Sequence, residues 1–186
     1  MINLTDNVDP TWVAETLPEN VTVECSDELP AEMPMAEDNC DDEVEVELTE
    51  EIVPGDCPSN YTIQRIFRAF DNCGNQAVYM QEITVEDTTA PALEVAADVT
   101  IECDQEVPAA AWEASDLCSE IASEVISEEV IPGDCPVAYT LVRTYTVTDA
   151  CGNAASAVQN ITVLDTTAPE LEIAADVPIE CDQEVP

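Results

Sequence analysis

Cysteine is the residue type whose spacing in this chain points most clearly to chemistry. The sequence contains nine cysteines and no histidine. The cysteines fall into four series that share one constant period: Cys25, Cys103 and Cys181; Cys40 and Cys118; Cys57 and Cys135; Cys73 and Cys151. Zinc sites use close cysteine pairs, usually with histidine, whereas successive cysteines within one period here are far apart in the sequence. The pattern therefore predicts disulfides and an oxidising compartment.

Carboxylates are the second chemically significant group. The chain has 42 aspartates and glutamates against three arginines and no lysine, and its formal net charge is −39. Nucleic acids and anionic membranes are excluded as partners because binding phosphate requires basic groups. Such a charge is typical of disordered chains, yet 46% of the residues are hydrophobic and they alternate with polar ones, so the chain can bury cores. Salt, divalent cations or protonation must relieve the repulsion.

The sequence around the cysteines repeats as well. Asp87-Thr-Thr-Ala-Pro91 returns at 165–169, and the segment 102–108 returns at 180–186. A fixed period of this size indicates a tandem array of small units. We expect a first repeat at 1–86, a second at 87–164 and the start of an incomplete third at 165–186. We also expect the partner of Cys181 to lie in sequence beyond residue 186.

Period-two patterns rich in β-branched and aromatic residues dominate each repeat. In the second repeat they predict strands at 93–95, 99–101, 109–114, 124–131, 139–148 and 154–163. No stretch has helical periodicity, and no apolar run approaches the roughly 20 residues that cross a bilayer. The fold class expected is all-β: tandem immunoglobulin-like antiparallel sandwiches, each with two disulfides. A tyrosine opens the strongest strand in each repeat, as in the next-to-last strand of such sandwiches.

The strand assignment selects one disulfide connectivity out of three. The first and third cysteines of a repeat are expected at one end of its sandwich, and the second and fourth at the other. The pairs predicted are Cys25–Cys57, Cys40–Cys73, Cys103–Cys135 and Cys118–Cys151. A bond that closes a loop of this size stabilises a fold by about 3–4 kcal/mol in the chain-entropy model. A sandwich built from a single repeat has a thin core, so such bonds are expected to be needed.

Acidic residues are expected to gather at one end of each sandwich, close to the linker. The candidate ligands are Asp87, Asp116, Asp149 and Asn153 in the second repeat, and Asp9, Asp38, Asp71 and Asn75 in the first. Converging oxygen ligands without nitrogen suit calcium, which takes six to eight oxygens. The alternative is that these side chains cap their own turns through bonds to the backbone. The chain lacks the D-x-D-x-D-G loop of dedicated calcium sites.

Matching inward positions on the strongest strand of each repeat carry Arg65 and Arg143. Two of only three basic residues at one repeat position indicate a structural ion pair or stacking on an aromatic ring. A ligand-binding role is the alternative. An enzyme is not expected, because the chain has no histidine, no G-x-S-x-G motif and no cysteine outside the disulfide pattern.

The motif set D-T-T-A-P, V-T-I-E-C, Y-T-x-x-R and D-x-C-G-N resembles the hyalin-type (HYR) repeat, in the four-cysteine form found in tandem in large surface adhesins of Bacteroidota. This resemblance covers essentially the whole chain, although Asp9-Pro-Thr-Trp-Val13 replaces D-T-T-A-P at the first linker. It implies an immunoglobulin-like fold, secretion to the cell surface, and a role in adhesion or as a stalk. Thr88 and Thr166 also resemble a short O-glycosylation signal of that phylum.

The function expected is a structural stalk or filament segment of a long secreted cell-surface adhesin. The alternative is a calcium-dependent or glycan-binding adhesion module. The turns 71–75 and 149–153 repeat closely, which favours a spacer without a deep cleft in either unit. The partners expected are neighbouring repeats, self-association side by side or end to end, and a surface or glycan contacted at a tip outside this segment.

Overall fold

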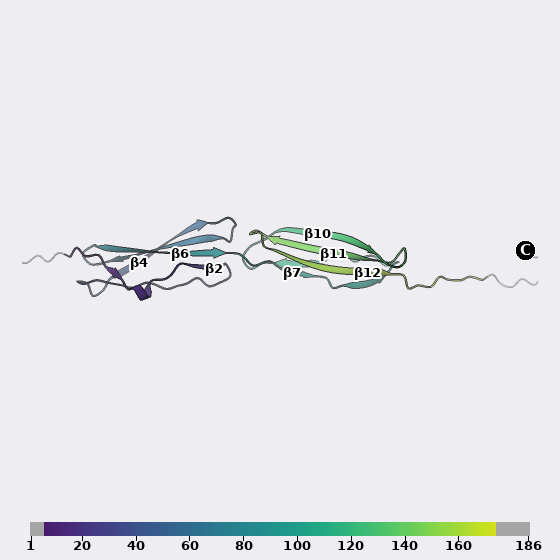
Figure 1. Cartoon of the computed structure of the whole chain (residues 1–186), viewed down its shortest axis with the longest axis horizontal. Coiled ribbons are helices and arrows are strands. Elements are labelled where there is room, and N and C mark those ends of the chain that lie inside the picture. Colours follow the sequence, from purple (N-terminus) through teal and green to yellow (C-terminus); the bar gives the residue numbers. More distant parts are fainter. Residues whose placement is uncertain (1–5, 174–186) are drawn as a thin grey trace, which may run out of the picture.

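The chain forms two β-sandwiches that lie end to end (Figure 1). The structure is a computed structural model and describes residues 6–173. The first sandwich contains β1 (Thr11–Trp12), β2 (Val21–Glu24), β3 (Ala36–Glu37), β4 (Glu45–Pro54), β5 (Tyr61–Phe70) and β6 (Gln76–Glu86), with the short 3-10 helix η1 (Ala14–Thr16). The second contains β7 (Ala92–Val95), β8 (Val99–Glu102), β9 (Trp112–Ser115), β10 (Ile121–Pro132), β11 (Tyr139–Asp149) and β12 (Ala154–Leu164). Cys181 and most of the expected third repeat lie outside the described residues.

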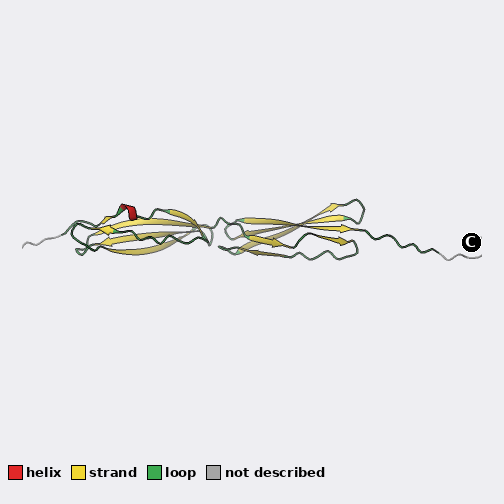
Figure 2. Ribbon diagram, turned by 90° about the horizontal axis from the view of Figure 1, so that it is seen from below, coloured by secondary structure: helices red, strands yellow, loops and turns green. Residues whose placement is uncertain are grey.

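Each sandwich packs a four-stranded sheet against a two-stranded one. The large sheets have the order β2-β6-β5-β4 and β10-β11-β12-β8, and the small ones pair β1 with β3 and β7 with β9. Within the large sheets, β2 and β8 run parallel to the last strand of their own unit, and the other pairs are antiparallel. Figure 2 shows the same layers from a second direction, with almost no helix. The expected all-β sandwich fold is confirmed.

The connection between β10 and β11 is shorter than the corresponding connection in an immunoglobulin domain. In a seven-stranded immunoglobulin domain two further strands lie between these positions. Here a tight turn joins them, in which Gly133 N donates to Ala138 O at 2.9 Å and Ala138 N donates to Cys135 O at 3.0 Å. Each unit is therefore reduced to a single hairpin at this point, and its small sheet has only two strands.

The core of each unit is the inner face of its two central strands. In β11 the alternate residues Leu141, Tyr145 and Val147 are buried, and Ile161 and Val163 of β12 pack with them. The outer strands β4 and β10 are exposed along most of their length. Such a small core supplies little stability, so covalent links between elements matter for this fold.

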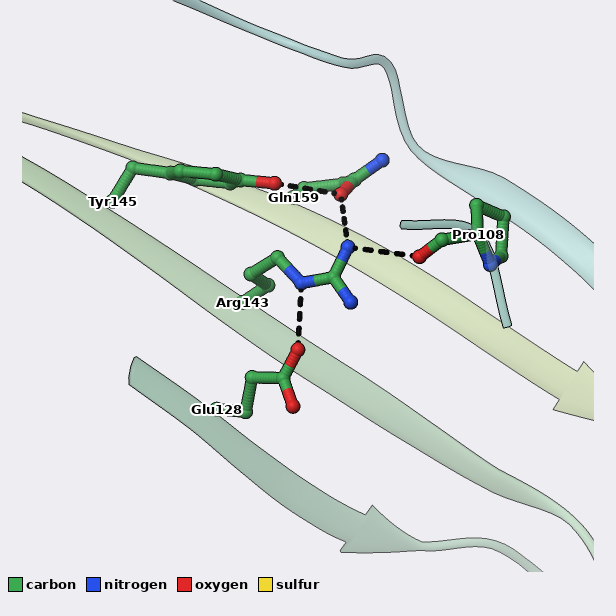
Figure 3. A network of polar contacts seen from close by, with 5 residues as sticks. All are labelled: Pro108, Glu128, Arg143, Tyr145 and Gln159. Carbon is green, nitrogen blue, oxygen red and sulfur yellow. Dashed lines mark hydrogen bonds and ion pairs between the residues drawn. The ribbon is translucent and has the colours of Figure 1, made fainter. Parts of the chain in front are cut away.

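A buried arginine ties the second core to its edge strand (Figure 3). Arg143 is 4% exposed, and its Nε forms an ion pair of 2.7 Å with Glu128 Oε1 of β10. Its guanidinium also donates to Pro108 O at 3.2 Å and to Gln159 Oε1 at 3.3 Å, and the Tyr145 hydroxyl donates to the same Gln159 oxygen at 3.2 Å. Burial by itself lowers the pKa of Arg143, but its contacts with Glu128 raise it above the ordinary value.

Arg65 occupies the matching place in the first unit. Its Nε forms an ion pair of 2.7 Å with Glu50 Oε1, and its guanidinium donates to Pro30 O. The structural ion pair expected for the two arginines is therefore confirmed in both units.

Candidate functional site at the junction between the sandwiches

Two disulfides cross from the first sandwich to the second. Cys25 is bonded to Cys118 with their Cα atoms 5.8 Å apart, and Cys57 is bonded to Cys151 with their Cα atoms 5.1 Å apart. Cys25 directly follows β2, and Cys57 lies in the turn between β4 and β5. Cys118 lies between β9 and β10, and Cys151 in the turn between β11 and β12. Four separate loops therefore meet in covalent pairs at one junction.

The connectivity predicted from the sequence is wrong. It placed all bonds within single repeats, as Cys25–Cys57, Cys40–Cys73, Cys103–Cys135 and Cys118–Cys151. The placement of the cysteines at the two ends of each sandwich agrees with the structure. In a tandem array, however, one end of a unit adjoins the opposite end of the next unit. We call these ends the tail, which carries Cys25 and Cys57 in the first unit, and the head, which carries Cys118 and Cys151 in the second. A tail cysteine therefore finds its partner in the neighbouring unit. Cys40, Cys73, Cys103 and Cys135 are exposed and carry no disulfide within the described residues.

The linker between the units is held from both sides at Asp87. This residue is 4% exposed. Its backbone N donates to Asn60 Oδ1 of the first unit at 2.8 Å. From the second unit, Asn153 Nδ2 donates to Asp87 O at 3.0 Å and to Asp87 Oδ1 at 3.3 Å. The Ser59 hydroxyl donates across the junction to Cys118 O. The disulfides are thus accompanied by direct polar contacts.

The two threonines of the linker bind back to the first unit. The carboxylate of Glu24 accepts from Thr88 N at 2.9 Å, Thr88 Oγ1 at 2.8 Å, Thr89 N at 3.2 Å and Thr89 Oγ1 at 2.8 Å. The bonds from Thr88 hold the pKa of Glu24 below its usual value. The Thr166 hydroxyl donates to Glu102 in the same manner. A glycan on Thr88 or Thr166 would replace this donor, and their glycosylation stays a prediction.

Three carboxylates converge where the linker enters the second unit. Asp87, Asp116 and Asp149 each offer one oxygen, and these oxygens all lie within 4.8 Å of one another. This is the gathering that the sequence predicts for these three residues. Asp87 Oδ2 is buried and has no hydrogen-bond partner. Oxygen ligands in such an arrangement fit a hard cation such as calcium.

Two of these aspartates, Asp116 and Asp149, also cap their own turns. Asp149 Oδ1 accepts from Cys151 N and Asn153 N, each at 2.9 Å, and Asp149 Oδ2 accepts from Asn153 Nδ2 at 2.9 Å. Burial raises the pKa of Asp149, but the hydrogen bonds from Asn153 outweigh it and leave the pKa below its ordinary value. Gly152 turns the chain with a φ of 95°, where a side chain would be strained. Asp149 therefore caps its own turn and also belongs to the group of converging carboxylates.

The head of the first unit contains related acidic groups. Asp38, Asp41 and Asp71 offer converging oxygens, and Asp6 and Asp38 converge with the Cys40 sulfur. Asp71 accepts from Asn75 Nδ2 at 2.5 Å, so Asn75 lies where it was expected. Burial raises the pKa of Asp71, and the bonds from Asn75 lower it below its ordinary value overall.

The expectation for Asp9 is wrong, because Asp6 takes its place. Asp9 is exposed and belongs to neither converging group, whereas Asn75 Nδ2 donates to Asp6 O at 3.5 Å. The segment from Pro10 to Cys25 is three residues longer than its counterpart from Pro91 to Cys103, so counting back one period from Asp87 misses the equivalent acid. The spacing D-x-x-x-P, which Asp6 shares with Asp87, is the signal that identifies it.

The longer segment of the first unit also creates an open hollow of about 560 Å³. It lies beside η1 and is lined by Leu17, Pro18, Met33 and Gln81 among others. Gln81 is 1% exposed, and its Oε1 has no hydrogen-bond partner. This hollow is open, and the second unit has an open hollow of about 450 Å³ beside Tyr139, so the expectation of a spacer without a deep cleft stays a prediction.

Comparison with known families finds a match within the first unit. Residues 13–85 match the family model of the HYR-like domain with four cysteines. The match spans the four cysteines of the first unit, and the second unit repeats them one period later. The expected HYR-type repeat is thereby supported for the first unit.

Solved structures of tandem extracellular domains are similar at low identity. Human protocadherin-24 EC1-2 (form II) is 17% identical, with 87% of this chain and 100% of that chain covered and a TM-score of 0.36. Drosophila N-cadherin EC1-4 is 13% identical, with 85% of this chain and 50% of that chain covered and a TM-score of 0.38. No curated protein matches this chain significantly. Among the described residues, no helix has the length and apolar character needed to cross a bilayer.

Proposed function

We propose that this chain is a stiff stalk segment of a secreted cell-surface adhesin, in which disulfides lock consecutive HYR-like units end to end. The observation that carries the proposal is the pair of bonds Cys25–Cys118 and Cys57–Cys151 across the junction. Together with the linker at Asp87 they give three covalent connections between the two sandwiches.

The number of connections decides the stiffness of the joint. A single peptide linker leaves two domains able to bend and twist about it, and relative motion is the usual expectation for domains joined in that way. One disulfide in addition still permits rotation about the line through the two connections. A second disulfide, from a different pair of loops, removes that rotation. A row of such joints holds a distant tip away from the surface that anchors it.

Other features agree with an extracellular structural role. Stable disulfides require an oxidising environment such as the cell exterior. The HYR-like match supports an adhesion-type module. The net charge of −39 favours an extended arrangement of successive units. The proposed stalk carries out no catalysis.

Small-angle scattering of the whole chain with intact and reduced disulfides tests the stalk proposal. We expect a narrow distribution of interdomain distances in the oxidised protein and a broader one with a shorter mean after reduction. A Cys25→Ser/Cys57→Ser variant should resemble the reduced protein, whereas the matched control Cys40→Ser/Cys73→Ser should resemble the oxidised one. Circular dichroism confirms that the sandwiches remain folded. Identical distributions in all samples would contradict the proposal.

A second candidate function, calcium-dependent stiffening, is favoured by one specific observation. Asp87 is buried between Asp116 and Asp149, and its Oδ2 has no hydrogen-bond partner. An unpaired buried carboxylate oxygen beside two further carboxylates is costly without a cation. A calcium ion at this point would bridge the linker and the head of the second unit. It would add to the disulfides by fixing the linker itself.

Calorimetric titration with calcium tests this second candidate. The Asp87→Asn variant should lose binding at the junction, while the exposed control Asp9→Asn should bind as the parent protein does. Equal binding by both variants and the parent would show that the acidic surface holds calcium only diffusely. Absence of binding in the parent protein would leave Asp116 and Asp149 as turn caps and Asp87 as a contact of Asn153, and the disulfide-locked stalk would remain intact.

A further inference from the structure

The first sandwich has an open hollow of about 560 Å³ on the flank that carries η1 (Figure 2). A volume of this size lies within the range of small-ligand sites. Part of the lining is apolar and comes from Leu17, Pro18 and Met33, and Gln81 lines the hollow as well. The hollow therefore offers an apolar surface next to a polar side chain.

A buried acceptor at this hollow has no donor. Gln81 is 1% exposed. Its Nε2 donates to Glu19 O at 2.8 Å, whereas its Oε1 has no hydrogen-bond partner. A buried acceptor without a donor is unfavourable, so a ligand that brings a donor to this oxygen gains free energy by meeting it.

The matching acceptor of the second unit already has its donors. Gln159 Oε1 accepts from the Tyr145 hydroxyl at 3.2 Å and from Arg143 Nη1 at 3.3 Å. In the first unit Phe67 stands at the position of Tyr145 and has no hydroxyl. Arg65, the counterpart of Arg143, directs its donors elsewhere. The unpaired acceptor is therefore specific to the first unit.

Charge selects the kind of donor. Glu15, Glu19 and Glu32 belong to the lining and are exposed, and no basic residue lines the hollow. Arg65, on the neighbouring strand, is balanced by Glu50 in an ion pair of 2.7 Å. Within the described part of the chain, none of the three lining glutamates belongs to a converging group of metal ligands. The hollow therefore suits an organic cation better than a metal ion or an anion.

Hydrogen bonds hold the wall of the hollow in place. The Thr16 hydroxyl donates to Val13 O at 2.8 Å and accepts from Met35 N at 2.8 Å. The Tyr79 hydroxyl donates to Pro18 O at 2.8 Å. These bonds tie η1 and the residues after it to neighbouring segments of the unit. A wall formed in advance needs little ordering when a ligand binds, which favours affinity.

We propose that this hollow binds a lysine side chain of a partner protein. The alkyl stem lies along Leu17 and Met33, and the ammonium group donates to Gln81 Oε1. Long cationic side chains commonly bury their stem on apolar surface while the charged end stays among polar groups. The other donors of the ammonium group face the glutamates and the solvent. The inference goes beyond the proposed stalk and does not depend on the junction.

The partner is expected to be a basic protein and not a second copy of these residues. None of the 186 residues is a lysine, so another copy cannot supply the side chain. Of the three arginines, Arg65 and Arg143 are buried in ion pairs. The net charge of −39 repels a second acidic chain and attracts a basic surface.

The second unit lacks this combination of groups. Alanines stand at the repeat positions of Glu19, Glu32 and Met33. The hollow at the corresponding place is about 270 Å³, and Gln159 is not part of its lining. Two units that act only as spacers have no reason to differ here, whereas a partner that recognises one unit requires a difference. The second unit is thus an internal control.

Nuclear magnetic resonance of the whole isotope-labelled chain, with its disulfides intact, tests the inference. The probe is the capped peptide acetyl-Gly-Lys-Gly-amide in about 0.15 M salt. We expect saturable shifts at the side-chain amide of Gln81 and at the backbone amides of Leu17 and Met33, with none at the side-chain amide of Gln159. The peptide with norleucine in place of lysine should bind about tenfold more weakly, because it has the stem without the charge.

Two pairs of variants separate the buried acceptor from the charge. Phe67→Tyr keeps the charge but gives Gln81 Oε1 an internal donor, so it should weaken binding of the lysine peptide about tenfold. Its matched control Tyr145→Phe should bind as the parent does. Glu32→Gln should weaken binding about two- to fivefold. Its control, the exposed Glu47→Gln on β4, should change nothing.

Several results would overturn the inference. They are the absence of saturable shifts, equal shifts at the two glutamine side chains, equal affinity for the norleucine peptide, or tighter binding of the arginine peptide. Unchanged affinity in Phe67→Tyr and in Glu32→Gln would do the same. If Phe67→Tyr does not fold, the peptide series and Glu32→Gln decide. The stalk proposal rests on the disulfides and survives each of these results.

Discussion

The heads of the two units have the same construction but different surroundings. The head of the second unit is closed by the tail of the first, through Cys118 and Cys151. The head of the first unit is open, and Cys40 and Cys73 are exposed. Yet an aspartate accepts from the backbone N of each of these four cysteines at 2.8–2.9 Å. Local hydrogen bonds therefore give the cysteine-bearing loops the same shape with and without a disulfide.

The cores of the two units differ at two hydrogen bonds. In the second unit the Tyr145 hydroxyl and the Arg143 guanidinium both donate to Gln159 Oε1. In the first unit Phe67 stands at the position of Tyr145, and Gln81 Oε1, the counterpart of the Gln159 oxygen, is buried without a partner. The cysteine-bearing head loops are thus alike in both units, whereas the cores tolerate substitution. Heads of the same construction are what a row of similar joints requires.

The largest effect is expected from breaking the closed junction while leaving the open ends unchanged. Cys25 and Cys118 are 93 positions apart, and the bond between them stabilises the folded pair by about 4–5 kcal/mol in the chain-entropy model. Pulled from its ends, the fully unfolded oxidised chain should be shorter than the reduced chain by about 330 Å, since the residues between the bonded cysteines cannot extend. Single-molecule force spectroscopy measures this difference.

The Cys25→Ser/Cys57→Ser variant is the control for the pulling measurement and should reach the length of the reduced chain. A shortening of about 230 Å that appears as two separate halves would indicate bonds within each repeat and contradict the closed junction.

A smaller effect is expected from the buried arginine of the second core. The Arg143→Met variant removes the donor to Pro108 O and to Gln159 Oε1, which leaves buried acceptors poorly satisfied. We expect the free energy of unfolding to decrease by about 2–3 kcal/mol. The matched control is Arg68→Met, because Arg68 lies on the outer face of the first unit and its side chain reaches only Thr49 Oγ1 at 3.4 Å. That variant should change stability by less than about 0.5 kcal/mol.

Denaturant unfolding followed by circular dichroism measures both arginine variants. A loss of stability in Arg68→Met that equals the loss in Arg143→Met would show that charge alone, and not the buried network, accounts for the effect.

The smallest effect is expected from exchanging the hydroxyl at the position that Phe67 and Tyr145 share in the two cores. Phe67→Tyr gives the unpaired Gln81 Oε1 a donor and should raise the free energy of unfolding by about 0.5–1.5 kcal/mol, whereas Tyr145→Phe should lower it by a similar amount. Thermal unfolding of the two variants provides the comparison. If both variants are destabilised, the first core has no room for the hydroxyl and the two cores differ in packing as well.

The sequence predicted the fold and much of the junction, because both depend on local patterns. Alternation within the strands identified β7, β8, β11 and β12, and this strand assignment placed the cysteines at the correct ends of the sandwiches. The meeting of Asp87, Asp116 and Asp149 followed from turns that lie at one end of a sandwich.

The bonds themselves could not be obtained in the same way. A disulfide depends on which ends meet in space, and the prediction treated each repeat as a closed unit. Cys25 and Cys57 lie at the same end of the first sandwich, yet each is bonded to a partner in the next unit. The shift from Asp9 to Asp6 arose from a three-residue extension that periodicity alone cannot detect.

The disulfide connectivity of the intact chain tests the central claim most directly. Proteolysis under non-reducing conditions that prevent thiol exchange, followed by mass spectrometry, identifies each cross-linked peptide pair. The account predicts peptides that join Cys25 to Cys118 and Cys57 to Cys151. Peptides that join Cys25 to Cys57 and Cys118 to Cys151 would contradict it, because two separately stapled sandwiches would then hinge on their linker alone.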